Sequence, residues 1–159
     1  MNFLIVHYQE SQSVPTLFKV MLTNRVIDKI ARDINRPCER IGLLMGTLED
    51  QSLWINEIIA GETERDTISC VFPTDRLAKV ANDIVEGRIT GRIVGWYHSH
   101  PGHGLFLSQT DIDTHMQFYQ FSPYAVSLVA DPTSEEFGVW IYENGTGIAQ
   151  LPANYLRII

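Results

Sequence analysis

The chain has 159 residues, of which 45% are hydrophobic and 19% charged, and it has no low-complexity stretch. This length and composition predict one globular domain, over residues 1–159, with enough residues to bury a core. Its 12 Lys and Arg residues against 19 Asp and Glu residues give a net charge of −7, and no basic cluster occurs. Nucleic acid and anionic membranes are therefore poor candidate partners, whereas a protein or a small molecule fits better.

Neither a membrane span nor a signal peptide is predicted. The longest apolar runs, such as FLIV and GLLMG, fall far short of the roughly 18 residues that cross a bilayer. The start, MNFLIVHYQES, lacks a basic region and its apolar run is too short for a signal peptide. We therefore expect a cytoplasmic protein, in which Cys38 and Cys70 stay reduced.

The first half of the chain mixes strand and helix patterns. In chain order it is predicted to contain strands at 3–6 and 16–23, a helix at 24–37, and strands at 39–46 and 52–60. Thr23 or Asn24 can cap the helix, and Pro37 is expected to end it. The strand ERIGLLMG is apolar or small on both faces, which is typical of a central strand. The polar segment 61–70, GETERDTISC, has no clear period and is interpreted as a loop or weak hairpin.

The second half continues the same mixture. It is predicted to contain a helix at 73–87, a strand at 92–100, a helix at 108–121, strands at 124–131 and 137–143, and one short strand in the tail 147–159. Strands and helices alternate only in part along the whole chain. The fold class is therefore predicted to be α/β, of the α+β type, with a mixed sheet flanked by about three helices.

Three side chains with metal-ligand chemistry gather around the strand at 92–100. His98 and His100 are two residues apart, so their side chains point to the same face of the strand. Asp111 follows in the first turn of the next helix, where the chain can return a carboxylate to the strand end. Two nitrogens and one oxygen leave a tetrahedral zinc one open position, where a catalytic zinc lowers the pKa of water to about 7.

Each of these residues also has a simpler interpretation. Ser108 and Asp111 form an S-x-x-D capping box, and such a tetrapeptide taken alone is more often a helix cap than a site. H-x-H alone is weak evidence for a metal. A lone glutamate such as Glu39 is usually a surface charge, although a carboxylate in phase with Ile41 in so apolar a strand needs a partner. The specific signal is the combination of the two histidines with the capping box at this separation.

That combination resembles the JAMM motif of the MPN+ metalloproteases. Ten residues separate His100 from Asp111, and Ser108 stands three before the aspartate. ERIGLLMG resembles the strand that carries the family's catalytic glutamate. GWYHSHPG, DIDTH and VADPT resemble segments of the proteasome-lid deubiquitinase and the signalosome deneddylase. The resemblance covers about residues 17–142 and implies an MPN/JAB1-like fold of cytidine-deaminase-like architecture.

The resemblance also implies a role for each motif residue. His98, His100 and Asp111 would hold one zinc ion, Glu39 would be the general base for a zinc-bound water, and Ser108 would stabilise the oxyanion. The substrate would be the tail of ubiquitin or a ubiquitin-like modifier joined to lysine, bound as an added strand. The segment 61–70 corresponds to the relatives' tail-binding hairpin. Substrate contacts are accordingly expected from six further residues: Gly61, Thr63, Thr67, Ser69, Trp96 and Phe106.

The favoured hypothesis is a zinc-dependent isopeptidase that removes ubiquitin or a ubiquitin-like modifier from lysine conjugates, with a proteasome or other protein complex as a candidate partner. The alternatives are a zinc hydrolase that trims a peptide extension or small amide, and a non-catalytic MPN scaffold. The motif encodes attack on a carbonyl and not the leaving group, so it does not separate the two enzymes. His103 is interpreted as a rim residue, because a fourth protein ligand would close the site. His115 is either a helix-surface residue or a partner of Asp111.

Overall fold

The structure, a computed structural model, describes residues 4–5, 19–61, 74–143 and 147–159. Its strands are β1 (Leu4–Ile5), β2 (Lys19–Leu22), β3 (Ile41–Glu49), β4 (Ser52–Ala60), β5 (Arg92–Ser99), β6 (Val126–Asp131), β7 (Glu136–Glu143), β8 (Gly147–Gln150) and β9 (Leu156–Ile158). Its helices are α1 (Asn24–Ile34), α2 (Thr74–Val85) and α3 (Gln109–Phe121), with a short 3-10 helix at Ala153–Tyr155.

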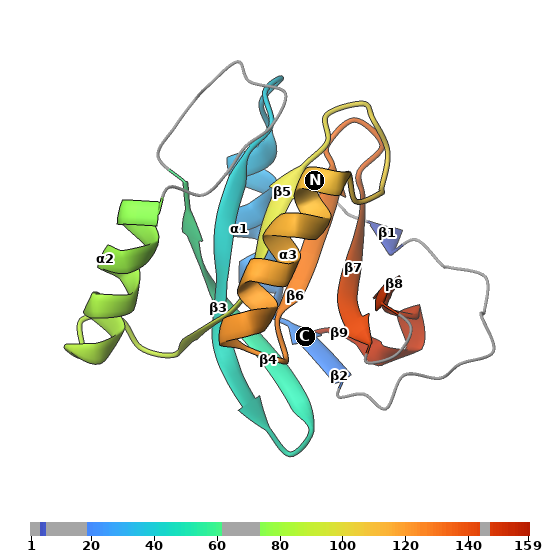
Figure 1. Cartoon of the computed structure of the whole chain (residues 1–159). Helices are drawn as coiled ribbons and strands as arrows, with labels where there is room; N and C mark the ends of the chain where they lie inside the picture. The colour runs from blue at the N-terminus through green and yellow to red at the C-terminus, as the bar shows by residue number, and fades with distance from the viewer. Residues whose placement is uncertain (1–3, 6–18, 62–73, 144–146) are drawn as a thin grey trace.

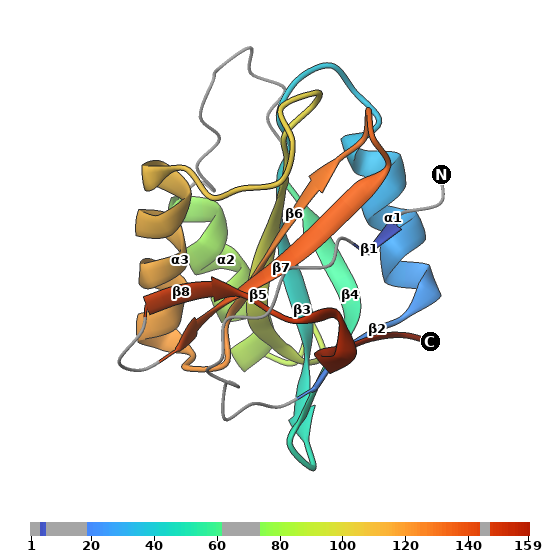
Figure 2. The same ribbon diagram turned by 90° about the vertical axis from the view of Figure 1, so that its right-hand side faces the viewer.

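All the described strands belong to one mixed sheet that runs through the middle of the molecule. The strand order is β1-β7-β6-β5-β3-β4-β2-β9, and β8 pairs with β7. Helix α1 covers one face of the sheet, while α2 and α3 lie on the other (Figures 1 and 2). The predicted fold class, a mixed sheet flanked by three helices, is confirmed.

The strand that carries the two histidines lies at the centre of the sheet. β5 pairs antiparallel with β3, where Ile41 faces His98, and parallel with β6, where His98 faces Val129. β3 is buried from Ile41 to Gly46, as its apolar faces predict. Because both neighbours of β5 are buried strands, the end of β5 is held rigidly by two hydrogen-bonded ladders.

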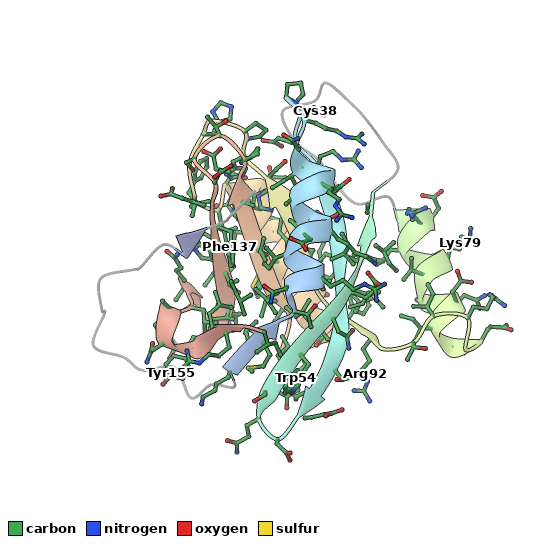
Figure 3. All side chains as sticks on the ribbon, turned by 180° about the vertical axis from the view of Figure 1, so that it is seen from behind. Cys38, Trp54, Lys79, Arg92, Phe137 and Tyr155 are labelled. Carbon is green, nitrogen blue, oxygen red and sulfur yellow. The ribbon has the colours of Figure 1, made fainter. Side chains whose placement is uncertain are left out.

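Two hydrophobic clusters fill the space on either side of the sheet. The helix α1 contributes Val26, Ile30 and Ile34 to the larger cluster, which continues across the sheet to Phe137 on β7. Figure 3 views this face, with α1 in front of the sheet. The smaller cluster joins the other face of β3 and β5 to Val80 of α2 and Phe118 of α3. Burying each of these apolar side chains contributes about 1.5–3 kcal/mol, which fixes the helices on the sheet.

Some boundaries differ from the predicted ones. Helix α1 ends at Ile34 and not at Pro37, because Asn35 already leaves the helical conformation with ψ of 59°. The tail forms two strands where one was predicted, and they pair with different partners, β8 with β7 and β9 with β2. Of the segment 61–70, only Gly61 lies within the described residues. No described helix combines the length and the apolar character that crossing a membrane requires.

Candidate metal centre

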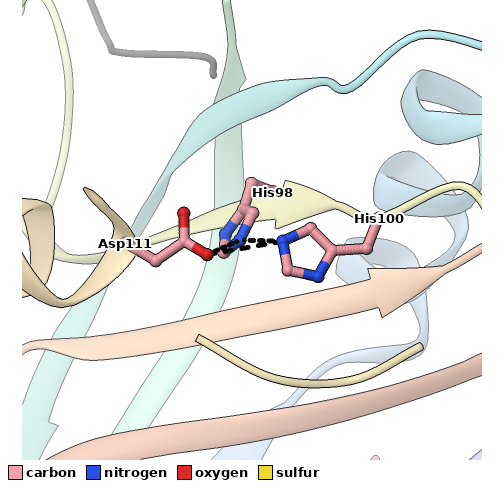
Figure 4. Close-up of side chains that lie close together, drawn as sticks. All are labelled: His98, His100 and Asp111. Atoms are coloured by element: carbon pink, nitrogen blue, oxygen red, sulfur yellow. Dashed lines mark hydrogen bonds and ion pairs between the residues drawn. The ribbon is translucent and has the colours of Figure 1, made fainter. Parts of the chain in front are cut away.

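The side chains of His98, His100 and Asp111 converge at the end of β5, as Figure 4 shows. The two histidine Nε2 atoms lie 2.9 Å apart. Oδ2 of Asp111 lies 3.1 Å from Nε2 of His98 and 3.4 Å from Nε2 of His100. All three residues are buried. The three predicted ligands therefore form one compact cluster.

The backbone explains why the two histidines share a face. β5 ends at Ser99, but the His100 N–H still donates to the Ala130 carbonyl of β6 at 2.9 Å. The ladder with β6 thus extends one residue beyond the strand, and the alternation of side chains continues through His100. His98 is also oriented by Trp96, whose ring stacks on the imidazole with centroids 4.5 Å apart and planes 8° apart.

Asp111 is placed by the start of α3. Ser108 is the N-cap: its Oγ accepts the Asp111 N–H at 3.2 Å, and Asp111 Oδ2 accepts the Ser108 N–H at 2.8 Å. The predicted capping box is therefore present. The same Asp111 oxygen that completes the box also faces both histidines. Capping and ligand geometry are thus two consequences of one side-chain conformation.

The charges of the three residues are strongly coupled. Burial alone would raise the pKa of Asp111, but hydrogen bonds with His100 and His98 and with the Ser108 N–H hold it well below its usual range. Burial lowers the pKa of His98. Burial also acts to lower the pKa of His100, yet Asp111 and, more weakly, Glu39 raise it. The site therefore keeps an anionic carboxylate beside two imidazoles.

The donor set fits a zinc ion. The separations of 2.9–3.4 Å between donor atoms approach the roughly 3.4 Å between tetrahedral ligands that each lie about 2.0–2.1 Å from the metal. A cation between the two imidazole nitrogens and the anionic oxygen would be attracted by all three donor atoms. Imidazole and carboxylate ligands in this number leave a fourth position open, as in catalytic zinc sites.

Comparisons with known proteins identify the family of the chain. A family model described as JAB1/Mov34/MPN/PAD-1 ubiquitin protease matches residues 15–124, more than half of the chain. The chain belongs to this family. The residues matched include Glu39, both histidines, Ser108 and Asp111.

Three curated relatives share between a third and two fifths of their aligned residues with the chain. "NAD(+) hydrolase TcpA" of a Theionarchaea archaeon is 37% identical over 98 residues, which cover 61% of this chain and 28% of that protein. "26S proteasome regulatory subunit rpn11" of Schizosaccharomyces pombe is 36% identical over 100 residues, 60% of this chain and 32% of that protein. "Ubiquitin carboxyl-terminal hydrolase RPN11" of Saccharomyces cerevisiae is 34% identical over 100 residues, with the same shares. The chain spans about a third of the length of these relatives.

A solved structure supports the fold. The solution structure of protein DSY2949 from Desulfitobacterium hafniense matches with a TM-score of 0.64 over 88% of this chain and 92% of that one. The two sequences are only 16% identical. The likeness therefore concerns the architecture of the family and not its chemistry.

Glu39, the candidate general base of the sequence analysis, lies two residues before β3. It is partly buried, and its charge acts on His100. The next residue, Arg40, ties this point to the ligand strand: its N–H donates to Ser99 Oγ at 2.9 Å, and the Ser99 N–H donates to the Arg40 carbonyl at 3.0 Å. Ser99 lies between the two histidines, so these backbone hydrogen bonds fix the position of Glu39 relative to the candidate ligands His98 and His100.

A buried hydrogen-bond network, which the sequence did not reveal, holds the backbone next to Glu39. The guanidinium of Arg40 donates to Asp33 Oδ1 of α1 and to the Gly61 carbonyl, both at 2.8 Å. The Tyr97 hydroxyl donates to Asp33 Oδ2 at 2.8 Å. The tyrosine ring lies against Gly42, where a Cβ atom would come within 2.4 Å of it. Burial, followed by the Asp33 charge, raises the pKa of Tyr97 far above its usual range, so it stays a neutral donor. The sequence signal for this network was Arg40, a charged residue directly before the apolar strand β3.

Of the six residues expected to contact substrate, only Phe106 is exposed beside the cluster within the described part of the chain. Phe106 is 47% exposed and its ring lies 4.6 Å from that of His100, so it forms an apolar wall beside the cluster. Trp96 is a correction: it is 1% exposed, and it packs between His98 and Phe118. Gly61 is buried, and its carbonyl is held by Arg40. Thr63, Thr67 and Ser69 lie outside the described residues.

The two remaining histidines near the site have different environments. His103 is exposed on the loop after β5, consistent with a rim position. His115 is fully buried, so it is not the helix-surface residue that the sequence allowed, and its described partner is not Asp111. Its Nδ1 makes a short hydrogen bond with Ser127 Oγ of β6, and burial lowers its pKa to about 4. It therefore joins α3 to the sheet as a neutral imidazole.

Proposed function

We propose that the protein is a zinc-dependent isopeptidase that removes ubiquitin or a ubiquitin-like modifier from lysine conjugates. The observation that carries the proposal is the convergence of His98, His100 and Asp111 within 3.4 Å of one another, in a chain of this family. One imidazole pair and one carboxylate give a zinc site with an open position. A non-catalytic scaffold needs no such arrangement, and the presence of both Glu39 and Ser108 also disfavours it.

The chain's own residues suit the attack of water on an amide carbonyl. His98, His100 and Asp111 would hold the ion. Bound zinc would supply Lewis acidity toward the scissile carbonyl and lower the pKa of an attacking water. Glu39 would take the proton of that water and deliver it to the lysine Nζ as the C–N bond breaks. In the described contacts Ser108 Oγ only accepts, so its O–H can donate to the developing oxyanion.

The substrate side of the proposal depends on the surroundings of the cluster. Phe106 offers an apolar wall that a glycine-rich tail can pass closely. The family description and the printed names of two relatives concern ubiquitin and the proteasome. Since the chain spans only about a third of those relatives, a ubiquitin-like conjugate as substrate, a proteasome or other complex as partner, and a cytoplasmic location all belong to the proposal.

One alternative enzyme remains worth testing. The site chemistry serves any amide, so a zinc hydrolase that trims a peptide extension or a small amide uses the same residues. The relative named as an NAD(+) hydrolase is matched over 28% of its length and the proteasome relatives over 32%, so none of these matches by itself transfers an activity to the chain. A substrate panel separates the two candidates: lysine-linked conjugates, linear peptide extensions and small amides.

The decisive experiment is cleavage of a lysine-linked ubiquitin-like conjugate by the purified full chain. Cleavage should stop after chelation, and it should be lost in Glu39→Gln. The matched control is Glu49→Gln, which removes an exposed carboxylate at the far end of β3. Activity that survives both chelation and Glu39→Gln would exclude the proposed mechanism.

A further inference from the structure

We propose that Asp131 is a positioning residue of the metal centre, which orients His100 through the backbone of Gly104 and thereby sets the affinity of the site for zinc. The inference rests on the proposed metal site. Asp131 ends β6 and is only 3% exposed, yet it contacts none of the three ligands in any described interaction. Its effect would pass through the loop that follows His100.

The Asp131 carboxylate collects backbone N–H groups. Oδ1 accepts from Gly102 and from Thr133, each at 2.9 Å, and Oδ2 accepts from Gly104 at 3.0 Å. Although burial opposes the charge, these bonds hold the pKa of Asp131 below its usual range. An ionised carboxylate only accepts, so both of its oxygens can bind these backbone donors. In an asparagine the side-chain amide nitrogen is itself a donor, so it would oppose one of the backbone N–H groups.

The loop held in this way supplies the partner of His100. The Gly104 carbonyl lies 3.3 Å from His100 Nδ1. A carbonyl oxygen only accepts, so a metal-bound His100 would carry its proton on Nδ1 and donate it to Gly104. Nε2 then presents its lone pair toward His98 and Asp111. A metal-binding histidine is commonly oriented by a hydrogen bond on its other nitrogen, and here that bond depends on Gly104.

The loop needs an external anchor because its backbone is unusual. Gly102 and Gly104 have φ of +74° and +82°, in the left-handed region that favours glycine. Glycines are also the residues that lose most backbone freedom on ordering. Asp131 binds the N–H of both, so one side chain holds both of these conformations. The same loop carries Phe106 onto the His100 ring, which gives His100 a second contact that depends on this anchor.

His98 is oriented by a ring stack and not by a hydrogen bond to the Asp131 loop. Its ring is fixed by the stack on Trp96, and within the described part of the chain its buried Nδ1 has no hydrogen-bond partner. Asp131 therefore acts on one imidazole of the pair. Removing its charge should loosen His100 while leaving His98 and Asp111 in place.

The test is a metal titration of the full chain after chelation, with Co²⁺ absorption as the signal and Zn²⁺ as competitor. Asp131→Asn should weaken binding by about 10–100-fold. The matched control is Asp83→Asn, the same change at a largely buried carboxylate of α2 that pairs with Arg88 and has no described contact with the metal centre. It should bind within about twofold of the original chain, so a general loss of stability would not imitate the expected result.

Each outcome has one meaning. If the unaltered chain binds no Co²⁺, the metal site and the inference built on it are both overturned. If the chain binds Co²⁺ and Asp131→Asn binds equally well, the role of Asp131 is overturned while the proposed function stands. If Asp131→Asn fails to fold, Gly104→Ala decides, because it strains the backbone at φ of +82° without a side-chain clash and leaves Asp131 intact: weaker Co²⁺ binding supports the inference, and unchanged binding contradicts it.

Discussion

Ser108 and Asp111 exchange two hydrogen bonds, from the Asp111 N–H to Ser108 Oγ at 3.2 Å and from the Ser108 N–H to Asp111 Oδ2 at 2.8 Å. This exchange begins helix α3 and also fixes the carboxylate that faces the two histidines. The cap occupies a lone pair of the serine oxygen and leaves its hydrogen available. A structural and a catalytic role for Ser108 are therefore compatible.

The two roles of Ser108 predict different variants. Glycine is a tolerable N-cap, so Ser108→Gly should change the free energy of unfolding by only a few tenths of a kcal/mol, whereas Ser108→Ala should lower it by about 1 kcal/mol. Both remove the hydroxyl donor and should lower kcat by about 100–1,000-fold. Denaturant unfolding and steady-state cleavage measure the two effects. Full activity in Ser108→Gly would reduce Ser108 to a helix cap.

The network around Arg40 predicts a large loss of stability. Arg40→Met leaves Asp33 buried without its ion pair, so the free energy of unfolding should fall by about 3–5 kcal/mol. The double variant Arg40→Met/Asp33→Asn removes that unpaired charge and should recover much of the loss. The control is Arg25→Met, which breaks an exposed ion pair with Glu57 and should cost about 0–1 kcal/mol. Equal losses in Arg40→Met and Arg25→Met would show that the buried network contributes little.

His115 predicts a specific loss of stability in acid. Its folded pKa of about 4 lies below the unfolded value of about 6.5. The unfolded chain therefore binds the proton first, so the contribution of neutral His115 is complete above pH 6.5 and is lost as the pH falls toward 4. Between pH 7 and pH 4.5 this loss is about 2 kcal/mol.

Urea unfolding of the original chain and of His115→Gln at both pH values measures the effect. Glutamine keeps a side chain that can donate or accept a hydrogen bond but does not titrate, so the variant should lose about 2 kcal/mol less between the two pH values. An equal pH dependence in the two proteins would mean that His115 accepts a proton in the folded state as readily as in the unfolded chain.

The approach of His98, His100 and Asp111 to one another could be predicted from the sequence because its determinants are local. The alternation of β5 puts His98 and His100 on one face, and the capping box turns Asp111 back toward them. Its supports could not, because they depend on which elements become neighbours. Arg40 contacts Asp33 only when α1 packs on the sheet. Asp131 accepts from Gly102 and Gly104 only when β6 pairs with β5.

The partner of His115 also could not be predicted from the sequence. Helical spacing placed it one turn after Asp111 and suggested the surface or a contact with that carboxylate. In the structure α3 packs on β6, and His115 meets Ser127. The one sequence signal was Ser127 itself, a polar residue inside the apolar run VSLVA, which needs a buried partner.

Restoration of cleavage by metal tests the central claim most directly. The full chain is stripped with a chelator, dialysed, and assayed on a lysine-linked ubiquitin-like conjugate with and without one equivalent of Zn²⁺. Cleavage should be absent in the stripped chain, return with zinc, and fail to return in His100→Ala. Cleavage by the stripped chain at the original rate, or zinc-restored cleavage by His100→Ala, would contradict a zinc isopeptidase built on this cluster.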